Sequence, residues 1–250
     1  MIEPLGAMLG GVAGAIAGSF LATLILRWPQ GRGVMRGRSA CDGCGRTLGA
    51  GDLVPLLSAM AQRGRCRTCG ARIDPLHGRV EAACAVIGAL AVGLAPDVAG
   101  LGWALLGWWL LTLAVLDWRH FWLPDALTLP LTFLGLTVGS WVTDAVLADR
   151  AIGAAAGYAG LLAVAWTYRW ARGREGLGLG DAKLLGALGA WFGWQALPFV
   201  LLLAAGTGLL AVGVAAALGK RVERATRVPL GTALAVAAVP GWWLSALLSG

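Results

Sequence analysis

The sequence predicts an all-α integral membrane protein with about eight transmembrane helices and a small cytoplasmic zinc-knuckle insertion between the first and the second. Composition indicates the class, since 58% of the 250 residues are hydrophobic, 13% are charged and the mean hydropathy is +0.74. In an ordinary soluble domain about a quarter of the residues are charged. Long apolar runs supply the predicted helices, and two Cys-X-X-Cys pairs in one long polar stretch supply the insertion.

Eight hydrophobic runs are predicted spans, and most approach the ~20 residues that a helix needs to cross a bilayer. The second and sixth runs are the shortest. Thirty-nine glycines fit close helix packing in lipid, and thirteen tryptophans fit anchoring at membrane interfaces. The start of the chain lacks the basic segment of a signal peptide, so we expect the first span to be retained. The predicted spans are 5–26, 80–95, 100–117, 125–143, 151–168, 182–194, 196–218 and 229–248.

Lys and Arg residues predict how the chain is oriented in the membrane. With the N-terminus in the periplasm, 19 of the 20 Lys and Arg residues fall on the cytoplasmic side, and Arg150 alone falls outside. Such a bias fits the tendency of cytoplasmic loops to be basic. It also accounts for the net charge of +7 without a nucleic-acid partner, because a basic inner face suits anionic lipid.

The polar segment 27–79 carries a predicted metal site. Its two Cys-X-X-Cys pairs are separated by 21 residues, a spacing typical of a four-thiolate zinc site. A segment this small buries little core, so a structural zinc ion would stabilise it. Disulfides are the alternative, which a reducing cytoplasm disfavours. We expect the remaining cysteine, Cys84 in the second span, to be a small buried apolar residue. The predicted zinc ligands are Cys41, Cys44, Cys66 and Cys69.

Asp117 and Asp181 lie where predicted spans end or begin, on the same predicted face of the membrane. Charged groups at such depth are costly and usually functional. Two neighbouring carboxylates can share a proton and activate water. Asp125 follows a proline and precedes an apolar run, so we expect it to cap a helix N-terminus.

The residues before Asp181 form a glycine-rich stretch. Gly178 and Gly180 alternate with leucines, and glycine permits close approach of another chain. A phosphate site at this helix start is disfavoured, because the full phosphate-binding patterns are absent and an aspartate has the wrong charge. Lys183 is expected to extend toward the membrane interface.

Taken together, these motifs resemble the bacterial type IV prepilin peptidases, which are GxGD-type membrane aspartyl proteases. The resemblance runs over nearly the whole chain. The matching segments are GSFL at 18–21, both Cys-X-X-Cys pairs, VPLLS at 54–58, RGRCRTC at 63–69, RVE at 79–81, LPD at 123–125 and GLGDAK at 178–183.

The resemblance implies a function and a division of the chain. Asp117 and Asp181 would be the catalytic aspartates, with Gly178, Gly180 and Lys183 as supporting motif residues. The enzyme would lie in the bacterial inner membrane, with its active site at the cytoplasmic face. It would remove the short basic leader of prepilins or of type II secretion pseudopilins. Residues 1–26 would be the first transmembrane helix, 27–79 the zinc-binding segment and 80–250 the transmembrane peptidase core.

The same resemblance implies a second activity, N-methylation of the new N-terminus with S-adenosyl-L-methionine. Two positions depart from the family pattern, since Ala22 stands where Asn is usual and Ala59 where Trp is usual. Two alternatives stay open at this point. One is a GxGD-type intramembrane protease with other substrates, and the other is a proton-coupled transporter that uses the two aspartates as a relay.

Overall fold

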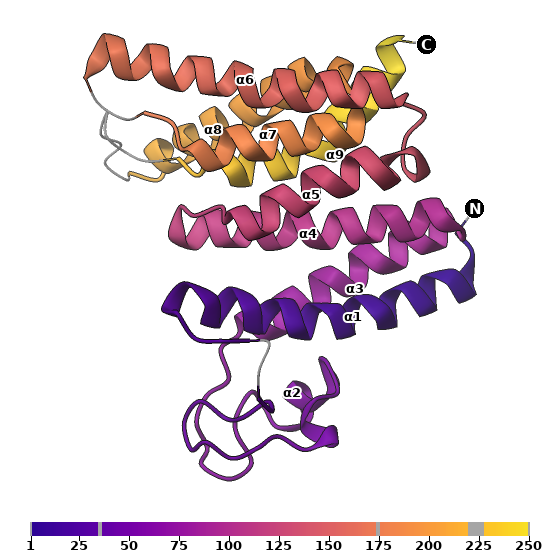
Figure 1. The fold of residues 1–250 in the computed structure, drawn as a ribbon. Helices are drawn as coiled ribbons and strands as arrows, with labels where there is room; N and C mark the ends of the chain where they lie inside the picture. Colours follow the sequence, from indigo (N-terminus) through magenta and orange to yellow (C-terminus); the bar gives the residue numbers. More distant parts are fainter. Residues whose placement is uncertain (1, 35–36, 174–175, 220–227, 250) are drawn as a thin grey trace. The chain divides into compact units, whose positions relative to one another are not determined.

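A computed structural model describes residues 2–34, 37–173, 176–219 and 228–249, and its long helices are drawn in Figure 1. Each of the eight predicted hydrophobic runs coincides with one long helix, so the prediction that these runs are helical is confirmed. The long helices are α1 (Pro4–Arg27), α3 (Leu76–Leu94), α4 (Val98–His120), α5 (Asp125–Val138), α6 (Leu147–Arg172), α7 (Leu179–Phe192), α8 (Leu197–Ala217) and α9 (Leu230–Ser249). The short ones are η1 (Trp28–Gln30), η2 (Ala50–Asp52), α2 (Leu57–Ala61), η3 (Gly139–Trp141) and η4 (Trp194–Ala196).

The protein is a multi-pass membrane protein. Within the described residues, five helical segments are long and apolar enough to cross a bilayer. The predicted count of eight spans is not confirmed by length. Helices α5 and α7 have 14 residues each, and the apolar part of α9 is also short. The five segments are Pro4–Gln30, Leu76–Leu94, Val98–His120, Leu147–Arg172 and Trp194–Ala217.

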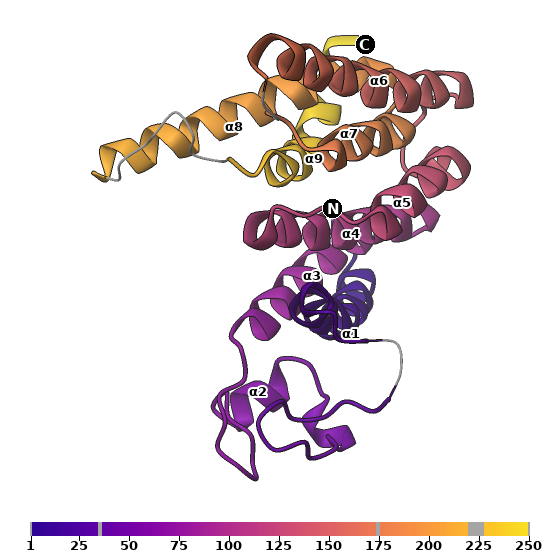
Figure 2. The same ribbon diagram turned by 60° about the vertical axis from the view of Figure 1, so that its left-hand side comes forward.

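The chain forms two compact units, Met1–Trp108 and Trp109–Gly250. In the first unit α1 packs along α3, and the segment that connects them carries η1, η2 and α2 (Figure 1). In the second unit α6 packs on α7, α8 pairs with α9, and α5 also packs on α7 (Figure 2).

Helix α7 is the core of the second unit. Leu184, Leu185, Leu188 and Trp191 have 0–2% of their surface exposed, and α5, α6 and α9 all pack against this helix. A helix that is apolar all round is one that neighbours surround. Burial by protein explains why a run of only 14 residues is so hydrophobic, and it fixes the helix whose first turn contains Asp181.

Helices α1 and α3 pack backbone to backbone through glycines. A Cβ atom added at Gly10 would overlap the carbonyl oxygen of Gly88, and one added at Gly14 would overlap that of Cys84. A Cβ at Gly11 would lie 3.5 Å from the Cβ of Ala89, an ordinary contact. Small residues at one face therefore set how closely the two helices approach.

Gly10→Ala is expected to destabilise the α1–α3 pair by about 1–3 kcal/mol, because the helices must separate to admit the new methyl group. Thermal unfolding of the purified protein in detergent measures the change. Gly11→Ala is the matched control and should leave the melting temperature unchanged or slightly raised, since alanine favours a helix. Equal melting temperatures for the two variants would contradict the packing described here.

Candidate active site

Both predicted catalytic aspartates lie in the second unit, one at the C-terminal end of a helix and the other at the N-terminal end of another helix. Asp117 is in the last turn of α4 and is 5% exposed, whereas Asp181 is in the first turn of α7 and is half-buried. The N–H of Asp181 donates to the carbonyl oxygen of Gly178, which precedes the helix (3.2 Å). Burial by the surrounding helices therefore holds two carboxyl groups in a partly dehydrated region.

The fold brings these two aspartates, 64 residues apart in sequence, to one place. Their carboxyl groups are close enough for direct charge–charge interaction, and Gly231 lies beside Asp117. A Cβ at Gly231 would lie 3.0 Å from Oδ2 of Asp117 and 2.6 Å from Cδ1 of Leu123. A side chain at this position would crowd Asp117 and Leu123, so glycine lets the start of α9 lie against the Asp117 carboxyl group.

Thr232 holds Asp117 directly. Its backbone N–H donates to Oδ2 of Asp117 at 2.7 Å. Its hydroxyl lies 3.2 Å from the same oxygen and 2.9 Å from the carbonyl oxygen of Ala114, and its single proton can be donated to either. Neither Gly231 nor Thr232 is among the site residues that the sequence predicts. The available signal was that a glycine and a threonine open an otherwise apolar run at 229–248.

The glycines before Asp181 have a packing role. Gly178 precedes α7 in an extended conformation, and a Cβ at Gly180 would lie 2.8 Å from the Cβ of Leu123. Leu123 lies in the turn that follows Asp117 in the chain. The absence of a side chain at Gly180 therefore lets the segment after α4 pack against the start of α7.

Asp125 and Lys183, which follow Asp117 and Asp181 in the sequence by a few residues, form an ion pair. Nζ of Lys183 lies 2.6 Å from Oδ1 of Asp125. The prediction that Asp125 caps a helix is wrong. Asp125 is the first residue of α5, Pro124 holds the cap position, and no side chain accepts a capping hydrogen bond there. The carboxylate turns instead to a lysine 58 residues away, a partner that local sequence does not indicate.

The four predicted metal ligands gather in the first unit. The sulfur atoms of Cys41, Cys44, Cys66 and Cys69 all lie within 4.8 Å of one another, and all four cysteines are free thiols. This donor set can bind one metal ion. Cys84 is fully buried, as predicted.

The two Cys-X-X-Cys pairs adopt the same turn. Gly45 N–H donates to the carbonyl oxygen of Cys41 (2.9 Å), and Gly70 N–H donates to that of Cys66 (3.0 Å). Both glycines have φ near +70°, a conformation that glycine adopts without strain. In the second turn, backbone N–H groups of Cys69 and Thr68 lower the pKa of the Cys66 thiol to about 6, which favours the thiolate that metals bind.

Asp52 ties the two halves of this segment together. Its carboxylate accepts hydrogen bonds from Gly49 N–H (3.1 Å) and Gln62 Nε2 (3.1 Å), and it pairs with Arg46 (3.0 Å) and Arg67 (3.4 Å). The Gly49 N–H and the two guanidinium groups hold the pKa of Asp52 below its usual range. The ionised carboxylate therefore organises the turns that present the thiols.

Comparison with known proteins agrees with this arrangement. The pattern of the type IV leader peptidase family matches residues 104–213, which contain both aspartates. The pattern of the bacterial peptidase A24 N-terminal domain matches residues 12–94, which contain the four clustered cysteines. No solved structure matches the chain.

Three relatives are each named prepilin leader peptidase/N-methyltransferase. The protein from Burkholderia pseudomallei is 45% identical over 199 residues, covering 79% of this chain and 64% of its own length. That from Aeromonas hydrophila is 42% identical over 209 residues, covering 82% and 70%. That from Klebsiella pneumoniae is 42% identical over 200 residues, covering 77% and 88%. The match thus spans just under two thirds of the Burkholderia protein. This chain belongs to the type IV leader peptidase family.

Proposed function

We propose that this protein is a membrane aspartyl endopeptidase that removes the short basic leader of prepilin-like proteins. The observation that carries the proposal is that the carboxyl groups of Asp117 and Asp181 lie close enough to interact, with Asp117 held by Thr232. Membership of the type IV leader peptidase family and the names of the relatives support the same substrate class.

The chemistry follows from two carboxyl groups that share one proton. A water molecule between them loses a proton to the ionised carboxylate as its oxygen attacks the scissile carbonyl carbon. The protonated partner donates its proton to the carbonyl oxygen. Collapse of the tetrahedral intermediate then breaks the C–N bond, and the released amine takes up a proton. Asp117 and Asp181 fill these two roles together, and Thr232 and Gly231 orient the first of them.

The active site belongs at the cytoplasmic face of the inner membrane under this proposal. The N-terminus is then periplasmic, as the distribution of Lys and Arg predicts. Arg150, the basic residue predicted on the other side, is buried and donates to the carbonyl oxygen of Gly135 (2.9 Å). Its guanidinium is therefore held inside the protein and is not part of a basic loop, so it does not weigh against this orientation. Arg36, Arg174, Lys220, Arg221, Arg224 and Arg227 lie outside the described residues.

The metal at the four thiols is proposed to be structural zinc. Four sulfur ligands ~2.3 Å from a tetrahedral zinc ion lie ~3.8 Å apart. Sγ of Cys41 and Sγ of Cys69 are 3.8 Å apart. All four positions of such an ion are filled by protein, so the metal would stabilise the segment and would not take part in hydrolysis.

We extend the proposal to N-methylation of the cleaved product, because the relatives are named as N-methyltransferases. The donor, S-adenosyl-L-methionine, supplies an electrophilic methyl group. When bound, the donor would pass this methyl group to the new N-terminal amine, leaving the electron pair of the broken carbon–sulfur bond on sulfur, and the amine would lose a proton. Of the two departures from the family pattern, Ala22 is fully buried in α1.

Mass spectrometry of the processed N-terminus, with donor supplied, should show a gain of one methyl group.

Co-expression with a prepilin tests the proposed cleavage most directly. The substrate carries a short basic leader followed by an apolar helix, and leader removal is followed by the mass of the product. A prepilin that keeps its leader, in membranes that contain the intact protein, would overturn the proposed function.

Thr232→Val is expected to lower kcat for cleavage about tenfold, which corresponds to about 1.4 kcal/mol. The substitution keeps the side-chain shape and the backbone hydrogen bond but removes the hydroxyl beside Asp117. KM should not change, because Thr232 is assigned to orienting Asp117 and not to binding substrate. Thr232→Ser restores the hydroxyl and should restore kcat. Equal kcat values for the valine and serine variants would exclude this positioning role.

A further inference from the structure

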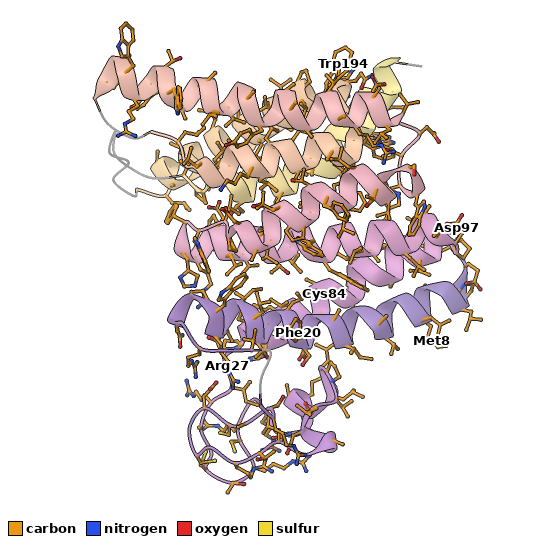
Figure 3. The ribbon with its side chains drawn as sticks, in the orientation of Figure 1. Met8, Phe20, Arg27, Cys84, Asp97 and Trp194 are labelled. Atoms are coloured by element: carbon orange, nitrogen blue, oxygen red, sulfur yellow. The ribbon has the colours of Figure 1, made fainter. Side chains whose placement is uncertain are left out.

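The first unit contains a cavity of about 370 Å³ where the C-terminal half of α1, the start of α3 and the connecting segment meet. The volume lies in the range of small-molecule sites. Arg27 lies at the end of α1 (Figure 3). It fixes one wall, because its guanidinium donates to the carbonyl oxygen of Ala40 (3.2 Å) and to Asp42 (3.1 Å). The cavity is therefore built by the fold of the unit itself.

Glu81 supplies a buried carboxylate to this cavity. The residue is 6% exposed, and one of its oxygens accepts the N–H of Leu56 at 2.8 Å. The other oxygen has no hydrogen-bond partner among the described residues. This oxygen is not among the fully buried unpaired atoms of the described residues, so it is open to the cavity, where a ligand with hydrogen-bond donors can reach it.

Leu56, whose N–H donates to Glu81, has a strained backbone conformation. Leu56 has φ = +61°, a conformation that is rare and strained for a residue with a side chain. This backbone conformation directs the Leu56 N–H toward Glu81. It also begins α2, whose Ser58 and Ala59 line the cavity. Strain of this kind is retained where the surrounding structure needs the geometry.

Part of the remaining lining suits a nucleoside. Charged side chains, four of them arginines, and two of the clustered cysteines also line the cavity, and an arginine suits the carboxylate of an amino-acid group. Phe20 of α1 supplies an aromatic wall, and Ser19, Thr23 and Gln62 supply neutral hydrogen-bonding groups. Aromatic faces bind bases by stacking, and a buried carboxylate is a common partner for the hydroxyls of a ribose.

We propose that this cavity binds the methyl donor S-adenosyl-L-methionine, and that the free oxygen of Glu81 accepts hydrogen bonds from the ribose hydroxyls. The inference rests on the N-methyltransferase part of the proposed function and assigns the site that this part requires. It does not depend on Asp117 or Asp181, which belong to the other unit.

Isothermal titration of the intact, detergent-solubilised protein with S-adenosyl-L-homocysteine tests the site without any turnover. One binding site per chain is expected. Glu81→Gln should weaken binding at least tenfold, because an amide NH₂ replaces the accepting oxygen. The amide oxygen of glutamine can still accept the Leu56 N–H, so the segment should keep its fold. Unchanged metal content in Glu81→Gln verifies this.

The 2′-deoxy and 3′-deoxy forms of the same ligand locate the contact. At least one should bind the unmodified protein several-fold more weakly than the parent ligand, and this difference should disappear in Glu81→Gln. A protein that cleaves prepilin but does not bind the parent ligand would overturn this assignment and leave the peptidase intact. Equal affinities in the unmodified protein and in Glu81→Gln would place the donor elsewhere. A protein that binds the ligand but cleaves no prepilin would contradict the peptidase and leave the cavity assignment standing.

Discussion

Asp117→Asn and Asp181→Asn are each expected to lower the rate of leader cleavage by about 10³-fold or more. An amide can neither take a proton from water nor share one with its neighbour, so water activation is lost whichever aspartate is replaced. Because the two groups act as one unit, the double variant should be little worse than either single variant. Quantitative mass spectrometry of prepilin processing in membranes gives the rates.

Asp125→Asn is the matched control for these variants. Asp125 is exposed and its carboxylate contacts Lys183, so its loss removes one surface ion pair, which is worth at most about 1 kcal/mol. Cleavage should fall by less than tenfold. Membrane insertion of all the variants should be unchanged. If either Asp117→Asn or Asp181→Asn keeps full activity, the catalytic assignment is wrong.

Removal of the metal is expected to unfold much of the segment between α1 and α3. Structural zinc supplies about 10 kcal/mol or more of folding free energy in small zinc domains, and this segment has little apolar core. The purified protein should contain about one zinc ion per chain. Cys41→Ser should reduce the metal content sharply and make the segment sensitive to a protease that leaves the unmodified protein intact.

Cys84→Ala is the control for the metal prediction, because Cys84 is buried in α3 and is not one of the four clustered thiols. It should retain its zinc and its protease resistance. The metal assignment would be overturned by protein that contains no metal and whose four cysteines are oxidised. Because we assign zinc a structural role, adding a chelator should expose the segment before it affects the aspartates in the other unit.

Local chemistry in the sequence was enough to predict much of this protein. Apolar runs predicted eight helices because the hydrophobic content of a segment does not depend on its partners. Paired cysteines predicted a metal site because a knuckle is closed by residues only a few positions apart. Asp117 and Asp181 stood out because a charge at the edge of an apolar run is visible without any structure.

Only the tertiary structure decided the contacts between residues that are far apart in the chain. Thr232 reaches Asp117 across 115 residues, Lys183 reaches Asp125 across 58, and Leu56 reaches Glu81 across 25. Local patterns misassigned Asp125 because a capping signal and an ion pair use the same carboxylate. The sequence alone therefore determined the class of the protein, its helices and its reactive groups. Packing decided which of these groups meet, because a folded chain places residues by the contacts of whole helices and not by their separation in sequence.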